Sequence, residues 1–343
     1  MKRWKGYEKG VNLGGWFSQC DYSKDRFENF ITEKDIENLA GWGIDHLRLP
    51  VDYNLVETEE GDYKEEGFAY IQRAIDWCRK YKLNMILDLH KTAGYSFDQG
   101  EQQTGFFEKE AYQERFYRLW EEFARRFAGD EKSIAFELLN EVTDEKTSDT
   151  WNRIALTCIS RIRKIAPQIK ILIGGYWNNS VKAVKDLPLP PDENIVYNFH
   201  SYDPLLFTHQ GASWVEGMPE DFRMPYKQTM EQYKIAQKID LPSSFIAPVQ
   251  GSEYEGVLDE KYFEQLFAEA INVAEERNVM LYCGEYGVIE KADTKSTLEW
   301  YKDIHQVFEK HGIGRAAWSY KEMDFDLQGS HLDEIRQELI KYL

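Results

Sequence analysis

Ile134-Ala-Phe-Glu-Leu-Leu-Asn140-Glu141 reads as a buried strand that ends abruptly on an amide and an acid. Apolar residues run through it with one interruption, Glu137. A parallel strand buried on both faces has this pattern, and polar groups at its carboxyl end face a ligand in barrels of alternating strands and helices. Glu141 could instead cap the next helix. A second acid in the same setting, in Met280-Leu-Tyr-Cys-Gly-Glu285-Tyr-Gly287, favours a ligand site.

Short apolar segments that resemble the first stretch recur along the whole chain, and most are followed by a loop and a helix pattern. They span residues 11–16, 46–51, 84–90, 134–141, 170–175, 195–202, 280–287 and 315–320. Strands that alternate with helices form a parallel sheet, and eight such units favour a closed barrel. We therefore expect an α/β fold, a single (β/α)8 TIM barrel that spans residues 1–343.

The predicted helices rest on local signals. Thr32-Glu-Lys-Asp35 has the character of a capping box before a helix that stops at Gly41-Trp-Gly43. Apolar residues at helical spacing form three further stripes: Ile71, Ile75 and Cys78; Phe116, Leu119, Trp120, Phe123 and Phe127; and Ile154, Cys158, Ile162 and Ile165. We interpret these stripes as core faces.

The interval after the sixth predicted strand is far longer than the others. Residues 203–259 must therefore form an insertion on the face where the site lies, and we expect a small lid or subdomain there. The insertion contains several aromatic residues, among them Phe207 and Trp214, which argues against a disordered loop.

Composition excludes several classes of partner. The net charge of -18 argues against nucleic acid and anionic membranes, because binding phosphates needs clustered Lys and Arg. We expect no membrane span, and a cytoplasmic location, because the N-terminus has no secretory signal pattern. We interpret Cys20, Cys78, Cys158 and Cys283 as small core residues in a reducing compartment.

The carboxyl ends of the eight predicted strands are nearly all polar or aromatic. They carry Arg48, His90, Asn140 with Glu141, Trp177, His200 with Tyr202, Glu285, and Trp318. Core packing alone rarely produces such a set on strands otherwise filled with apolar residues. The pattern indicates a site in the mouth of the barrel.

Glu141 and Glu285 lie on the fourth and seventh predicted strands, across the barrel from one another. Paired carboxylates that face one cavity suit the cleavage of a glycosidic bond, where one protonates the leaving oxygen and the other attacks or stabilises the anomeric carbon. Arg48, His200 and Tyr202 are expected to give the two acids different pKa values, because a cation and a phenol hydroxyl hold one carboxylate ionised while burial keeps the other protonated.

A metal centre is the main chemical alternative, since Asp88, His90 and His200 are also ligand types. Metal-dependent barrels usually show a His-x-His pair on one strand, and Asp88-Leu-His90 is the nearest approach in this chain. Phosphate loops, dinucleotide-binding glycine patterns and a Gly-x-Ser-x-Gly elbow are absent from the sequence. We therefore expect neither a metal nor a cofactor.

Aromatic residues at the rim favour a sugar ligand, because the flat C–H faces of pyranose rings stack on indole and phenol planes. Trp318 and Trp177 at strand ends are the first candidates, and Trp16 and Trp214 are the next. Four tryptophans on predicted helices are expected to be buried: Trp42, Trp77, Trp120 and Trp300.

Six stretches together resemble glycoside hydrolase family 5, in the clan of retaining barrel glycosidases, and within it the clostridial cellulase C type. They are Leu47-Arg-Leu-Pro50, Asp88-Leu-His90, Leu139-Asn-Glu141, Phe199-His-Ser-Tyr202, Gly284-Glu285-Tyr-Gly287 and Trp318. The resemblance spans nearly the whole chain. One departure is Lys91, where many relatives have a second consecutive histidine, and it leaves the fine sugar preference open.

The resemblance implies a role for each matching residue. Glu141 is expected to be the general acid/base and Glu285 the nucleophile, with carboxyl groups roughly 5 to 5.5 Å apart. The others are expected to act as follows: Arg48 and Tyr202 hold Glu285, Asn140 binds the sugar 2-hydroxyl, His90 binds another hydroxyl, His200 bonds near Glu141, and Trp318 forms the floor of the cleavage subsite.

The resemblance further implies a monomeric, retaining endo-β-1,4-glucanase that acts on β-glucan oligo- or polysaccharides. An exo-acting β-glucanase, a β-glucosidase or a mannan-directed member of the same family remains open. A sugar-binding protein without catalysis is the alternative from another class, and the presence of both acids and Asn140 argues against it.

Overall fold

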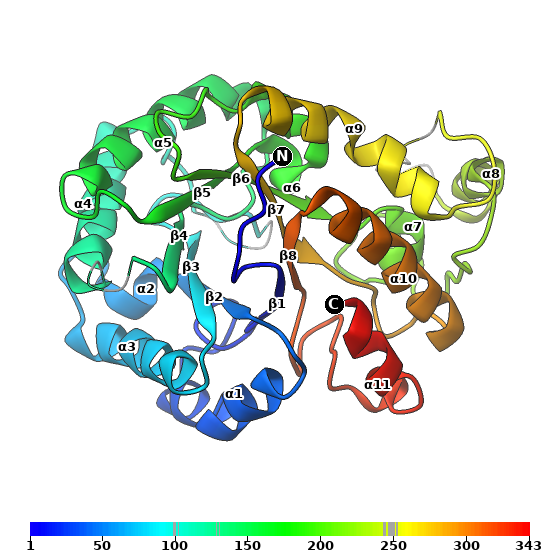
Figure 1. Cartoon of the computed structure of the whole chain (residues 1–343), viewed down its shortest axis with the longest axis horizontal. Coiled ribbons are helices and arrows are strands. Elements are labelled where there is room, and N and C mark those ends of the chain that lie inside the picture. The colour runs from blue at the N-terminus through cyan, green and yellow to red at the C-terminus, as the bar shows by residue number, and fades with distance from the viewer. Residues whose placement is uncertain are drawn as a thin grey trace.

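The computed structural model describes residues 1–98, 101, 103–127, 129, 131–242, 245, 251 and 253–343. Eight parallel strands form a closed barrel in which each strand pairs with the next and β8 pairs with β1. Helices surround the strands on the outside (Figure 1). The predicted (β/α)8 barrel is therefore confirmed.

The strands are β1 (Lys9–Asn12), β2 (His46–Asp52), β3 (Asn84–Lys91), β4 (Ile134–Glu137), β5 (Lys170–Gly174), β6 (Ile195–Ser201), β7 (Met280–Tyr286) and β8 (Gly314–Ala317). The α-helices are α1 (Glu33–Ala40), α2 (Tyr53–Val56), α3 (Glu65–Lys80), α4 (Glu110–Phe127), α5 (Ser148–Arg163), α6 (Tyr176–Asn179), α7 (Leu205–Thr208), α8 (Met230–Asp240), α9 (Glu260–Glu276), α10 (Thr294–His311) and α11 (Arg336–Leu339). Shorter helical turns are η1 (Arg26–Phe30), η3 (Glu145–Thr147), η4 (Val181–Asp186), η5 (Ser330–Leu332) and η6 (Ile340–Tyr342).

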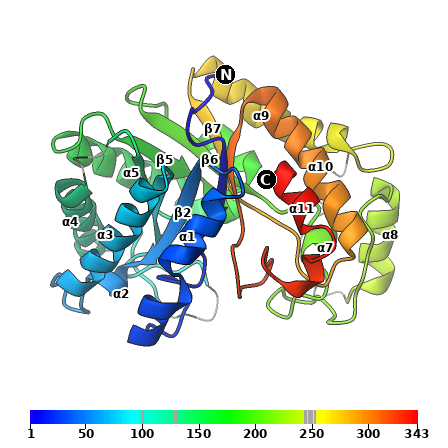
Figure 2. The same ribbon diagram turned by 60° about the horizontal axis from the view of Figure 1, so that its bottom comes forward.

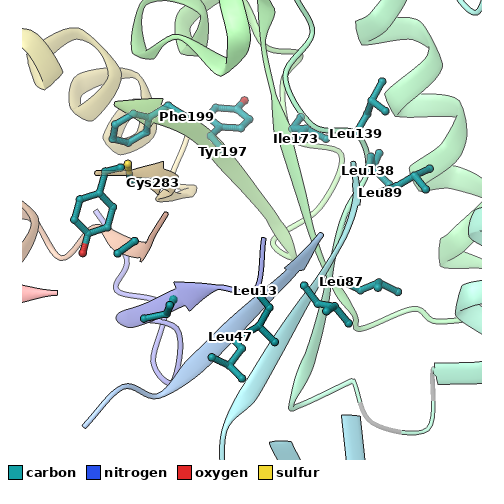
Figure 3. Packing of buried hydrophobic residues seen from close by; sticks show 14 of the residues in the cluster. Leu13, Leu47, Leu87, Leu89, Leu138, Leu139, Ile173, Tyr197, Phe199 and Cys283 are labelled. Atoms are coloured by element: carbon teal, nitrogen blue, oxygen red, sulfur yellow. The ribbon is translucent and has the colours of Figure 1, made fainter. Parts of the chain in front are cut away.

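Side chains on the strands alternate between the barrel interior and the layer under the helices. The interior cluster contains Trp4, Tyr7, Ile86, Ala135, Leu172, Val196, Met280, Tyr282 and Ala316. Their neighbours along the strands, such as Leu47, Leu87 and Phe199, belong to the larger outer cluster, part of which is seen in Figure 3. Because a strand repeats every two residues, Asp88, Glu137 and Asn198 face the interior one step nearer the carboxyl ends.

A register shift between β6 and β7 determines where Glu285 points. Phe199 pairs with Cys283, and the pairing then skips a residue so that His200 is opposite Glu285. Cys283 belongs to the outer cluster, so a regular strand would turn Glu285 outward as well. The irregularity instead brings Glu285 into the barrel mouth, as β-bulges often do next to active sites.

The predicted cap and apolar stripes agree with the structure, whereas Trp42 and Trp77, expected to be buried, are only partly buried. Thr32 and Asp35 form the capping box of α1, with the Thr32 backbone N–H donating to Asp35 at 2.8 Å. The stripe residues on α3, α4 and α5 are buried. Ile165, which follows α5, is partly buried against the same core.

Three strands end several residues earlier than predicted. The fourth strand stops at Glu137, four residues before Glu141. The first strand covers Lys9–Asn12, because the chain turns at Gly14 and Gly15, where Gly15 has a φ of +72°. The apolar residues Leu13 and Trp16 that extended the pattern are buried outside the strand. The last strand, Gly314–Ala317, stops before Trp318 and Tyr320. Both residues are buried although they lie outside the strand, so the apolar pattern extends beyond the strand pairing.

Segment 203–259 contains α7 and α8 between β6 and α9. Its aromatic residues Phe207, Tyr226 and Tyr233 are buried in the main core. The Tyr226 hydroxyl donates to Asp303 of α10 at 3.0 Å. Figures 1 and 2 place α8 at the outer edge of the molecule, beside α9 and α10. The described part of the segment is thus a packed addition to the barrel.

Cys78, Cys158 and Cys283 are buried and Cys20 is partly exposed, and all four are free thiols. The prediction of a core position is therefore wrong for Cys20. Among the described helices, none is long and apolar enough to cross a membrane.

Candidate active site

A cleft of about 690 Å³ lies at the carboxyl ends of the strands. It brings together nine of the ten residues predicted for the site: His90, Asn140, Glu141, Trp177, His200, Tyr202, Trp214, Glu285 and Trp318. His90, His200 and Glu285 lie on β3, β6 and β7, and the others lie just after β4, β5, β6 and β8 or in segment 203–259. The tenth residue, Arg48, is fully buried and supports the others from below.

Both carboxylate oxygens of Glu285 accept hydrogen bonds. Arg48 Nη1 donates to Oε1 at 2.8 Å, and the Tyr202 hydroxyl donates to Oε2 at 2.9 Å. The carboxylate is therefore fixed in orientation by a cation on β2 and a phenol just after β6. Hydrogen bonds from charged donors to carboxylates are among the stronger ones in proteins.

Arg48 is also the centre of a buried network that extends beyond Glu285. Its guanidinium donates to both oxygens of Glu137, at 2.7 and 2.8 Å, and lies 3.0 Å from Asp88. It also donates to the side-chain oxygen of Asn140 at 2.9 Å. The Asn140 amide nitrogen is buried and has no hydrogen-bond partner within the described part of the chain.

Glu141 follows β4 in a left-handed backbone conformation, with a φ of 42°. The Tyr95 hydroxyl donates to its backbone carbonyl at 2.7 Å. Its side chain is held by His200 Nδ1 at 2.9 Å from Oε1 and by Asn178 Nδ2 at 3.0 Å from Oε2. The carboxylate therefore points into the cleft, and the alternative that it caps the next helix is wrong.

Burial raises the pKa of both acids to about 7. The positive charge of Arg48 lowers the pKa of Glu285, whereas the nearby Glu141 raises it. Both pKa values are thus raised, and a difference between them stays a prediction. The two acids differ in their partners: Arg48 and the Tyr202 hydroxyl for Glu285, neutral donors for Glu141. Because their charges interact, the pair is expected to titrate as a unit.

His200 lies between the two acids. Its Nδ1 is 2.9 Å from Glu141 Oε1 and 3.7 Å from Glu285 Oε2. Burial lowers the pKa of His200 to about 4, so the imidazole is neutral at higher pH. One oxygen from each acid and the His200 nitrogen all lie within 4.8 Å of one another. These three atoms are of types that could hold a metal, and metal-free catalysis stays a prediction.

The separation of the acids bears on the stereochemistry of hydrolysis. An oxygen of Glu141 and an oxygen of Glu285 lie within 4.8 Å. Retaining glycosidases place the two carboxyl groups about 5–5.5 Å apart, and inverting enzymes about 6.5–9.5 Å apart. The close approach of these oxygens fits the retaining arrangement.

His90 and Trp318 form one wall of the cleft. Their rings are parallel within 3° at a centroid distance of 5.7 Å. His90 Nδ1 is 2.6 Å from Asp88, which leaves Nε2 as the ring nitrogen that Asp88 does not hold. Trp318 needs the close approach allowed by Gly14, where a Cβ would lie 2.8 Å from the indole. Gly14 is thus part of the support for the wall.

Lys91, the departure from the family pattern, points away from this wall. Its ammonium pairs with Glu101 at 2.6 Å, and only 4% of its side chain is exposed. It lines a neighbouring cavity of about 270 Å³ with Tyr22 and Tyr53. Phe97 lines the cleft, and its ring packs edge-on against His90 and lies 5.9 Å from the Lys91 ammonium.

The aromatic candidates divide into two groups. Trp177 and Trp214 are 47% and 49% exposed, and both line the cleft. Trp16 is fully buried and stacks on Phe17, so its prediction as a sugar platform is wrong. Phe207 is also fully buried, against Tyr226, so it does not face the cleft.

Several residues of the site were not singled out from the sequence. Asn178 contacts Glu141, and His209 with Phe325 forms an aromatic cluster beside Tyr202 and Trp214. In the sequence, Glu137 is only an interruption of an apolar strand. An acid at an interior position of a barrel strand is a usable signal, because it requires a buried cation such as Arg48.

A closed barrel with two buried carboxylates and exposed aromatic rings at its mouth defines a barrel glycosidase. The family model described as "Cellulase (glycosyl hydrolase family 5)" matches residues 4–324. The chain belongs to glycosyl hydrolase family 5 and is a glycoside hydrolase.

Known proteins similar to this chain support the assignment. Cellodextrinase A from Ruminococcus flavefaciens is 48% identical over 315 residues, which cover 92% of this chain and 86% of that protein. Endoglucanase C from Acetivibrio thermocellus is 40% identical over 341 residues, 98% of each chain. The solved structure of Thermotoga maritima Cel5A in complex with cellobiose has a TM-score of 0.78 at 21% identity and covers 98% of both chains, which shows the shared fold.

Proposed function

We propose that this chain is a retaining endo-β-1,4-glucanase in which Glu285 is the nucleophile and Glu141 the general acid/base. The observation that carries the proposal is the hydrogen bonding of Glu285: Arg48 and Tyr202 hold its two oxygens within reach of Glu141. A carboxylate aimed by a buried cation is suited to attack, whereas Glu141, held by neutral donors, is suited to exchange a proton.

In the first step, a Glu285 oxygen bonds to the anomeric carbon while the glycosidic C–O bond breaks. The leaving oxygen takes the proton of Glu141. In the second step, the Glu141 carboxylate removes a proton from water, the water oxygen bonds to the anomeric carbon, and the bond to Glu285 breaks. Two inversions give net retention, and both acids return to their starting states.

The remaining cleft residues bind the sugar in this proposal. The unoccupied amide N–H of Asn140 donates to the 2-hydroxyl, and His90 binds another hydroxyl of the same ring through Nε2. Trp318 lies under the ring at the cleavage subsite, and Trp177 and Trp214 stack on neighbouring rings. His200 orients Glu141 through their hydrogen bond.

We further propose that segment 203–259 is a substrate-binding lid. It leaves the barrel directly after His200 and Tyr202, and Trp214 is its exposed contribution to the cleft. Its attachment to α10 through Tyr226 gives it a fixed base. We further expect the enzyme to be a monomer, which light scattering would test.

A second candidate function is the cleavage of short cello-oligosaccharides in place of polymer. It is favoured by the 48% identity to a protein named Cellodextrinase A. A mannan-directed activity has a weaker basis: a solved structure of Thermotoga maritima Cel5A, similar in fold, contains mannotriose.

Product analysis distinguishes these functions. Purified enzyme is incubated with carboxymethyl cellulose, mixed-linkage β-glucan, β-1,3-glucan, mannan, xylan and cello-oligosaccharides of two to six units. An endo-β-1,4-glucanase lowers the viscosity of the soluble polymer early and releases oligomers of mixed length. Release of only glucose or cellobiose, with no early drop in viscosity, would contradict endo action.

A further inference from the structure

The turn after β5 has an unusual backbone. Trp177 and Asn178 have φ/ψ values of 50°/52° and 57°/53°, and Asn179 has a φ of 54°. Three consecutive residues are therefore left-handed, a conformation that L-residues disfavour and that Asn tolerates better than most. The turn is tied to the loop after Glu141, because the backbone N–H of Asn178 donates to the Val142 carbonyl at 3.0 Å.

This turn reaches both oxygens of Glu141. Asn178 Nδ2 donates directly to Oε2 at 3.0 Å. Asn179 Nδ2 lies 3.3 Å from His200 Nε2, so that nitrogen accepts and the ring proton resides on Nδ1. Nδ1 then donates to Glu141 Oε1 at 2.9 Å. Two neighbouring asparagines thereby act on one carboxylate, the first directly and the second through the tautomer of a histidine.

We propose that Asn178 is a positioning residue that sets the protonation range of Glu141 and thereby the alkaline limit of activity. The inference rests on the proposed role of Glu141 as acid/base. An N–H donor stabilises the ionised carboxylate and does nothing comparable for the protonated form. The first step needs Glu141 protonated, so this donor holds the alkaline limit of kcat/KM at a lower pH than burial alone would give.

Other charged and titratable groups around Glu141 do not replace this donor. They are Arg48 on β2, Asp88 on β3, Tyr95 after β3, Glu137 on β4, His200 and Tyr202 on and after β6, and Glu285 on β7. In the described part of the chain, Asn178 supplies the hydrogen bond that Oε2 accepts. Burial raises the pKa of Glu141, and Asn178 opposes this effect.

The test is the pH profile of kcat/KM for Asn178→Gly, since glycine keeps the left-handed backbone and removes only the amide. The pH at which activity falls by half on the alkaline side is expected to rise by about one unit. Asn178→Asp should raise it further, because it adds a negative charge beside Glu141. Asn278→Gly is the matched control: it changes another left-handed asparagine (φ 54°), after α9, and should leave the profile unchanged.

An unchanged alkaline limit in both Asn178 variants, with melting temperatures like that of the control, would overturn the inference. A purely structural role would lower stability and leave the pH limit in place. Azide rescue of Glu141→Ala tests the acid/base role of Glu141 separately from the role of Asn178. If azide restores activity but the alkaline limit of kcat/KM is unchanged in the Asn178 variants, only the role of Asn178 is wrong. Without rescue, the acid/base role of Glu141 and this inference are both wrong.

Discussion

Arg48 Nη1 and Glu285 Oε1 lie 2.8 Å apart, in a site where the same guanidinium also binds both oxygens of Glu137. One buried cation thus orders two carboxylates from opposite sides of the barrel. Glu137 is fully buried, so it holds Arg48 in place without contacting the substrate. The orientation of Glu285 therefore depends on a network that extends below the cleft floor.

The two acids should respond differently to substitution. Glu285→Gln is expected to lower kcat on every substrate by at least about three orders of magnitude, because no group remains to form the covalent bond. Glu141→Ala should retain activity on aryl glycosides whose leaving group needs no proton, and azide should restore it by attacking the intermediate. Kinetics on aryl cellobiosides test this prediction. If both variants lose activity on these substrates equally, the roles assigned to Glu141 and Glu285 are wrong.

Tyr202→Phe should weaken catalysis by loss of a single hydrogen bond to Glu285. Without this donor, the ionised form of Glu285 is less stable and its pKa rises, so the acid limb of kcat/KM should move to higher pH. We expect a fall in kcat/KM of about tenfold to a hundredfold. Tyr320→Phe is the control, since that hydroxyl bonds to Asp35 outside the cleft; an equal effect there would indicate a general loss of stability.

Trp214→Ala tests the lid. Stacking binds the sugar in ground and transition states alike, so KM on long glucans should rise about tenfold with a smaller change in kcat. KM on a short aryl glycoside should change less. The neighbouring Phe207→Ala instead removes a buried ring and should lower the melting temperature. If KM is unchanged for Trp214→Ala on both substrates, segment 203–259 does not bind substrate through Trp214, and its role is structural.

Stability should depend on pH through Glu141. Burial raises its pKa in the folded chain from 4.5 to about 7, so the folded chain binds more protons here over that range. The stabilising contribution is full below about pH 4.5 and is lost as the pH rises through 7. Glu141→Gln removes this loss, so its melting temperature relative to the parent should increase from pH 5 to pH 8. A difference in melting temperature that stays constant from pH 5 to pH 8 would contradict the raised pKa.

The barrel and most of the site could be predicted because strand periodicity has clear physical causes. Interior positions of buried strands must be apolar or paired, so polar residues on them, such as Arg48 and His90, indicate a site. Glu285 was recognised from its motif, yet simple alternation from Cys283 would have turned it outward. The bulge between β6 and β7 that corrects its direction depends on pairing between strands and leaves no mark on β7 alone.

Burial of aromatic residues in loops could not be predicted. Trp16 and Phe207 resemble Trp177 and Trp214 in sequence context, and only the packing of η1, α3 and segment 203–259 decides which rings are covered. Asn178 was missed because its role depends on a left-handed turn. The Asn178-Asn179 pair is itself a turn signal, since asparagine tolerates that conformation.

The most direct test of the account is covalent trapping with a 2-deoxy-2-fluoro-β-cellobioside that carries a good leaving group. The fluorine slows both steps and the leaving group restores the first, so a retaining enzyme accumulates its glycosyl intermediate. Peptide mass spectrometry should find the sugar on Glu285, with one label per chain. Label on Glu141, or full inactivation of hydrolysis without any covalent sugar, would contradict the assignment of Glu285 as the nucleophile.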